Sequence, residues 1–160
     1  MTSVSPVNEG RQYPERPIVG IGAVIVDDRG RVVLIKRRYD PLAGRWSLPG
    51  GAVELGETLE ASVAREMLEE TGLDVDVGPV IEVFDRITVD DDRRVRYHYV
   101  LVDYLCWPVG GELCAGGDVD DAVFVAPADL KAYDLTVKAT AVIERALQLA
   151  REAPRPARRT

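Results

Sequence analysis

GGAVELGETLEASVAREMLEETGL, residues 50–73, is the stretch that decides the fold. It opens with two glycines, continues as a helical pattern and holds six glutamates. Thr58 is the expected N-cap, because its hydroxyl can accept a hydrogen bond from a free N–H of the first turn. Gly72 is the expected end, because glycine adopts the left-handed conformation that closes many helices. The pattern therefore predicts a helix between these two residues.

The predicted helix has two adjoining faces. At about 100° per residue, the angle that follows from about 3.6 residues per turn, an apolar arc consists of Leu59, Val63, Ala64, Met67 and Leu68. The neighbouring arc is acidic and consists of Ser62, Glu66, Glu69 and Glu70. We expect the apolar arc to dock on a sheet, which places the acidic arc at the border of the core.

The acidic arc has two interpretations. One is a solvated helix face, which is common for glutamates. Against it, Glu66 and Glu70 stand four apart and repel each other on a helix by roughly a few tenths of a kcal/mol, where a solvated face usually carries a lysine or arginine. The other is a site for Mg²⁺ or Mn²⁺, which prefer several oxygen ligands and bridge substrate phosphates. Arg65 could pair with Glu57 and brace the preceding loop against the helix.

Composition and charge limit the classes of partner. The chain has 160 residues, 46% of them hydrophobic and 29% charged, with a net charge of -7. This acidity argues against a nucleic-acid duplex as the main partner, since phosphate contacts need clustered lysine and arginine. The sequence contains no run of about 18 apolar residues, so it predicts no membrane span. Two cysteines and one histidine argue against a zinc site and favour reduced thiols in a cytoplasmic protein.

The rest of the chain predicts one domain over residues 17–150, between a flexible arm at 1–16 and a flexible tail at 151–160. Strands and helices alternate irregularly, so we expect an α/β architecture with a mixed sheet between helices. We expect strands at 18–26 and 31–38, paired as a hairpin, and short strands in 46–53 that Pro49-Gly50-Gly51 interrupts. Later elements are strands at 80–87, after a break at Gly78-Pro79, at 95–106 and at 123–125, a helical turn at 127–131 and a helix at 136–150.

Gly51, Glu57 and the run Arg65 to Leu73 follow the spacing G-x5-E-x7-R-E-U-x-E-E-x-G-U, where U is a bulky aliphatic residue. This pattern resembles the Nudix box, with Met67 at one U position. The resemblance extends over residues 17–147. It implies an α/β/α sandwich and the metal-dependent hydrolysis of a nucleoside diphosphate linked to another group.

The resemblance also implies roles for individual residues. Glu66, Glu69 and Glu70 would be metal ligands, joined by the Gly50 carbonyl, and Glu57 and Arg65 would be the bracing pair. Glu69 or Glu70 could also be the general base. In some relatives the base lies instead on a loop before the last strand, where the acidic candidates, each of which could equally belong to a solvated turn, are Glu112, Asp118, Asp120 and Asp121.

The sequence constrains the identity of the substrate less than it constrains the fold or the metal site. The candidates for phosphate contacts are Arg37, Arg38, Arg45 and Arg86, and those for base stacking are Tyr39, Trp46, Phe84, Tyr97 and Tyr99; surface solubility and core packing are the alternatives. RYHYVLVDYLC and GGELCAGGDVDDAVFV resemble small ADP-ribose pyrophosphatases. A proline typical of that class is absent, since Thr88 and Val89 stand at its place. The alternatives are a MutT-like nucleoside triphosphate pyrophosphatase, including one for oxidised nucleotides, a dinucleoside polyphosphate hydrolase and a non-catalytic nucleotide-sensing module. We also expect a homodimer.

Overall fold

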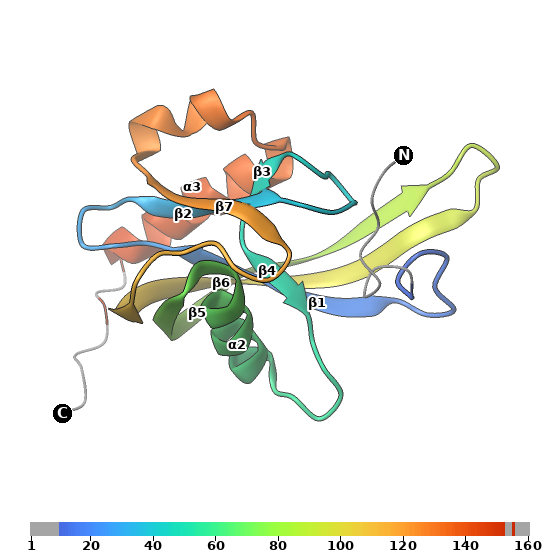
Figure 1. Cartoon of the computed structure of the whole chain (residues 1–160), viewed down its shortest axis with the longest axis horizontal. Helices are drawn as coiled ribbons and strands as arrows, with labels where there is room; N and C mark the ends of the chain where they lie inside the picture. The colour runs from blue at the N-terminus through green and yellow to red at the C-terminus, as the bar shows by residue number, and fades with distance from the viewer. Residues whose placement is uncertain (1–9, 153–154, 156–160) are drawn as a thin grey trace.

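The computed structural model describes residues 10–152 and 155. Two α-helices, a 3-10 helix and seven strands are arranged as a sandwich (Figure 1). In chain order the elements are β1 (Ile18–Ile25), β2 (Val32–Arg37), β3 (Trp46–Ser47), β4 (Gly50–Ala52), α2 (Leu59–Thr71), β5 (Leu73–Val89), β6 (Val95–Gly111), β7 (Val119–Val125), η1 (Pro127–Tyr133) and α3 (Val137–Glu152). The predicted α/β/α sandwich is confirmed.

The strands form two sheets, where the sequence led us to expect one. The first has the order β4-β1-β6-β5 and is mixed, because β1 runs parallel to β6. The second is antiparallel and has the order β3-β2-β7. The predicted hairpin of β1 and β2 is wrong, since an isolated bridge between Val26 and Val32 is their only ladder contact among the described residues. The chain leaves β1 through a turn at Asp27 and enters the other sheet.

Each helix covers a different face of the first sheet. Alternate residues of β1 point to opposite faces, so Ile21 and Ile25 pack with Val63 of α2 while Val24 packs with Ile143 of α3. Each of these side chains is almost fully buried, which stabilises the fold by about 1.5–3 kcal/mol per side chain. The two apolar clusters hold the sheet between α2 and α3.

A short crossover connects the two sheets. Strands β3 and β4 belong to different sheets, and only Leu48 and Pro49 separate them. The Pro49 carbonyl accepts a hydrogen bond from the Ala23 N–H at 3.1 Å, which fixes the crossover to β1. The sequence led us to expect Gly50 and Gly51 in the interruption, but both belong to β4 and pair with Gly22 and Ile21 of β1.

Three strands are longer than predicted. β5 continues through Gly78-Pro79, because register shifts between Val77 and Glu82 absorb the irregularity. β6 continues to Gly111, and β7 begins at Val119. Ladder pairing over this length stabilises residues whose local sequence is unfavourable for a strand.

The predicted terminal segments are described only in part. In the predicted arm, the Tyr13 N–H donates to the Arg96 carbonyl at 2.8 Å, and the Arg94 guanidinium lies 4.6 Å from the Tyr13 ring centroid. Residues 1–9, 153–154 and 156–160 lie outside the described residues. Both cysteines are free. No helix within residues 10–152 is long and apolar enough to cross a membrane.

Candidate active site

The helix α2 begins and ends as predicted. The Thr58 hydroxyl accepts from the Ala61 N–H at 3.1 Å, and Gly72 adopts a left-handed conformation with φ 72°. The predicted apolar arc is partly wrong, because Leu68 is 51% exposed and Ala64 is also exposed. Residues Ser62, Glu70 and Thr71 are buried in their place. The helix therefore turns its acidic arc further inward than the apolar pattern suggests.

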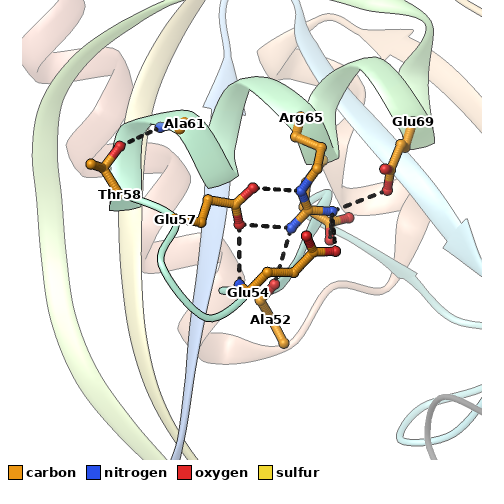
Figure 2. Close-up of polar contacts among 8 residues, drawn as sticks. Ala52, Glu54, Glu57, Thr58, Ala61, Arg65 and Glu69 are labelled. Carbon is orange, nitrogen blue, oxygen red and sulfur yellow. Dashed lines mark hydrogen bonds and ion pairs between the residues drawn. The ribbon is translucent and has the colours of Figure 1, made fainter.

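Arg65 joins the loop before α2 to the acidic arc (Figure 2). Its Nε and Nη2 donate to the two carboxylate oxygens of Glu57 at 2.7 and 2.9 Å, and Nη2 also donates to the Ala52 carbonyl at 3.3 Å. Nη1 donates to Glu66 at 3.0 Å and to Glu69 at 3.2 Å. The contact predicted between Glu57 and Arg65 is therefore present. The Arg65 hydrogen bonds hold the pKa of Glu57 down at about 2.

Glu70 lies behind this network, against strand β4. Its Oε1 accepts a hydrogen bond from the Gly50 N–H at 2.7 Å. Burial, with a smaller contribution from the nearby Glu66, raises the pKa of Glu70 to about 8. Burial also raises the pKa of Glu66, whose carboxylate packs against Gly51 so closely that any Cβ there would overlap it. Two carboxyls thus lie against bare glycine backbone, and burial disfavours the ionised form of both.

A cavity of about 550 Å³ opens beside these carboxylates and is bordered by both sheets and both α-helices. Of the site residues predicted from the sequence, its wall contains Glu66, Glu69, Glu70, Gly50, Arg37, Arg86, Asp118 and Arg65. Three of the aromatic candidates, Tyr39, Phe84 and Tyr99, line it as well. Burial lowers the pKa of Arg37, while the Glu70 carboxylate acts in the opposite direction. The cavity therefore has acidic and basic groups facing one space.

Two other predicted substrate contacts, Arg38 and Trp46, lie outside the cavity wall. The Arg38 Nε donates to Asp120 at 2.7 Å, and its Nη2 donates to the Val119 carbonyl. The Trp46 ring packs edge-to-face on Tyr133 with centroids 5.1 Å apart. Both residues thus hold neighbouring segments together, outside the cavity wall.

Several predicted candidates also stand away from the wall. Arg45 donates to the Asp134 carbonyl at 2.7 Å, and Tyr97 is buried beside Tyr99. Of the loop acids, Glu112, Asp120 and Asp121 are not part of the wall, which leaves Asp118.

The sequence reasoning missed four charged wall residues, Arg11, Glu54, Asp103 and Lys138. Arg11 lies in the segment interpreted as an arm, and Lys138 stands at the start of α3. Asp103 had a signal, because it is an acid inside the apolar run VLVDYLC.

Comparison with protein families agrees with this geometry. The model of the NUDIX domain matches residues 16–146. The chain belongs to the NUDIX family. The match includes α2, all seven strands and most of α3, so it covers both the acidic arc and the opposite wall of the cavity.

Named relatives of this NUDIX chain differ in their substrates. It is 40% identical over 108 residues to an ADP-ribose pyrophosphatase of Methanocaldococcus jannaschii, a match that covers 68% of this chain and 61% of that protein. It is also 40% identical over 109 residues to a putative 8-oxo-dGTP diphosphatase 2 of Mycobacterium tuberculosis, covering 60% of this chain and 75% of that protein.

Solved structures have the same fold. A MutT NUDIX hydrolase from Burkholderia pseudomallei superposes with a TM-score of 0.71 at 35% identity, covering 82% of this chain and 98% of that one. The NUDIX domain of Shewanella oneidensis NrtR, complexed with ADP ribose, superposes with a TM-score of 0.68 at 22% identity, covering 84% and 88%.

NUDIX hydrolases generally use divalent metal ions, and in this chain the ligand candidates are the carboxylates of the acidic arc. In the described residues, no three His, Cys, Asp or Glu side chains are arranged so that they could hold an ion as they stand. Arg65 occupies oxygens of Glu66 and Glu69. The donor chemistry does fit, because the cavity wall offers carboxylate oxygens, which hard divalent cations prefer. The ionised forms of half-buried Glu66 and buried Glu70 would also be stabilised by a nearby cation.

Proposed function

We propose that this NUDIX protein hydrolyses the pyrophosphate bond of a nucleoside diphosphate derivative with Mg²⁺ or Mn²⁺, and that ADP-ribose or a related ADP-sugar is its first candidate substrate. The observation that carries the proposal is the position of Glu66, Glu69 and Glu70 in the wall of a cavity of about 550 Å³. Cavities of roughly 300–1,000 Å³ are typical of small-molecule sites. The wall also holds the arginines that a pyrophosphate needs.

The acidic residues of the wall have separate roles in this proposal. Glu66, Glu69, Glu70 and the Gly50 carbonyl would hold a divalent metal ion, which would supply positive charge for the phosphates and lower the pKa of the attacking water. Arg65 orients Glu66 and Glu69 by direct hydrogen bonds and is itself anchored by Glu57. Glu69, Glu70 and Asp118 are the remaining candidates for the general base, because each lines the cavity.

Basic residues would bind the phosphates. Arg37 and Arg86 line the same cavity, and Arg37 donates its Nε to the Pro41 carbonyl at 2.6 Å, which orients the guanidinium. An oriented guanidinium can donate two parallel hydrogen bonds to a phosphate.

The name of the M. jannaschii relative and the ADP ribose complex of the NrtR domain support ADP-ribose. The M. tuberculosis and B. pseudomallei relatives support a second candidate, a MutT-like nucleoside triphosphate pyrophosphatase. A non-catalytic sensor is the less favoured alternative, because every glutamate of the box is kept. Cytoplasmic location and a homodimer stay predictions.

Product analysis tests the proposal. The purified chain is incubated with ADP-ribose, nucleoside triphosphates and dinucleoside polyphosphates in Mg²⁺, with a chelator control. AMP plus ribose phosphate would support the first candidate, and nucleoside monophosphate plus pyrophosphate the second. No hydrolysis of any compound would contradict the enzyme and favour the sensor.

A further inference from the structure

Asp103 is a buried acid that the proposed chemistry does not use. It lies in the middle of β6, lines the cavity and is only 6% exposed. No residue in the part of the chain that the structure describes forms a hydrogen bond with its carboxyl group. A buried polar group without a partner costs free energy, so its presence needs an explanation.

The neighbours of Asp103 form no hydrogen bond with its carboxyl group, although the charge of Arg86 on β5 favours its ionised form. Glu82, its register partner on β5, forms an ion pair with Lys138 of α3. The Lys138 ammonium also lies 4.3 Å from the centroid of the Phe84 ring, so this cation is already engaged. On the other side, a Cβ at Gly22 would overlap the Asp103 Oδ1. The carboxyl group therefore occupies a space that exists because residue 22 has no side chain.

The surrounding wall suits a flat ring. Alternate residues of β6 share one face of the sheet, and Tyr99, Leu101 and Asp103 all line the cavity. Phe84 is the register partner of Leu101 and lines it too. Aromatic rings stack on nucleobases of every kind, which gives affinity without selectivity. A carboxyl group beside such rings adds the selectivity between bases that stacking lacks.

We propose that Asp103 is a specificity-determining residue that accepts a hydrogen bond from the exocyclic amino group of the substrate's nucleobase. The inference rests on the proposed function, since it assumes a nucleotide in this cavity. An ionised carboxylate only accepts hydrogen bonds, so its ligand has to present a donor, and a phosphate would be repelled. Burial raises the pKa of Asp103 to about 6, and at pH 8 the group is therefore ionised.

Two pairs of nucleotides that differ only in an amino group test this role. AMP is compared with purine riboside monophosphate, and GMP with IMP, by calorimetric titration at pH 8. We expect the amino-bearing member of at least one pair to bind about tenfold more tightly, the value of a hydrogen bond to a charged group. The pair that discriminates also indicates whether adenine or guanine is recognised.

Variants separate recognition from a structural role. Asp103→Ala should abolish the discrimination, and Asp103→Asn, which keeps a neutral oxygen acceptor, should retain part of it. Asp85→Asn is the matched control, because it removes an exposed charge of the neighbouring strand β5 outside the cavity wall and should leave the discrimination unchanged.

Equal binding within both pairs, no binding of any of the four nucleotides, or full discrimination in Asp103→Ala would overturn the inference. These results are independent of the hydrolysis panel. A chain that hydrolyses its substrate without regard to the amino group refutes the role of Asp103 alone. A chain that discriminates among monophosphates but hydrolyses nothing refutes the proposed enzyme alone.

Discussion

The carboxyl groups at the two ends of the cavity, near α2 and near α3, differ in whether they have hydrogen-bond donors. Under α2, every carboxylate has a donor: Arg65 donates to Glu66 and Glu69, and the Gly50 N–H donates to Glu70. Near α3, Asp103 has no hydrogen-bond partner among the described residues. The first end is satisfied within the chain and is held in place. At the second end, the Asp103 carboxyl group can still accept a hydrogen bond from a ligand in the cavity.

This difference suggests that the residues near α2 serve catalysis and that Asp103 serves substrate selection. Carboxylates that orient a metal must be held at fixed positions, and hydrogen bonds from neighbouring residues do this. A group that selects a ligand gains discrimination when the wrong ligand leaves it unpaired. We therefore expect changes under α2 to alter turnover and changes near Asp103 to alter substrate preference.

The largest effect should come from Glu69→Gln. It removes a charge from the acidic arc while keeping the shape of the side chain, and we expect turnover to fall by about a hundredfold or more. Glu69 is half exposed, so the thermal unfolding midpoint should change little. The control is Glu60→Gln, an exposed first-turn glutamate of the same helix. Near-normal hydrolysis by Glu69→Gln would refute the metal-site assignment.

Two adjacent arginines provide a second test, in which the expected effect is smaller but the control is more closely matched. Arg37 lines the cavity, whereas Arg38 bonds Asp120 and the Val119 carbonyl away from it. Arg37→Ala should raise KM by about tenfold, because it removes charged hydrogen bonds to phosphate. Arg38→Ala should leave KM unchanged and lower the unfolding midpoint slightly. Steady-state kinetics that showed the reverse order would mean that the phosphates bind elsewhere.

The smallest effect concerns acid stability and the bracing pair. The pKa of Glu57 is held at about 2, below its ordinary value of 4.5. The unfolded chain therefore binds this proton first as the pH falls, and the stabilisation present at neutral pH is lost between about pH 4.5 and pH 2. Glu57→Gln should show a shallower loss of unfolding free energy over this range in denaturant titrations. An identical pH profile for the variant would show that the pair does not stabilise the fold.

The α2 end was predictable from sequence because one helix carries most of it. Fixed spacing places Glu66, Glu69 and Glu70 on one arc, and Thr58 and Gly72 mark the ends of the helix. The buried face was misjudged at Leu68, because the periodicity does not say that Glu70 will gain a backbone donor from β4. The α/β/α fold and the family followed from the same stretch.

The α3 end was not predictable because it is assembled from β1, β5, β6 and α3. Strand register decides that Gly22 lies beside Asp103, and no local pattern reveals a register between strands so distant in the chain. The predicted hairpin failed for a related reason. Two neighbouring apolar strands look alike whether they pair or enter different sheets, and the turn at Asp27 allows both.

The crossover at Leu48 and Pro49 limits how the protein can adapt to larger ligands. Two residues are too short to let the sheets part independently, so any widening of the cavity pulls on β4. Gly50 would then move away from Glu70 and loosen the 2.7 Å hydrogen bond between them. Widening of the cavity is thereby coupled to the position of Glu70, so we expect new substrate ranges to arise through side-chain replacement along the wall.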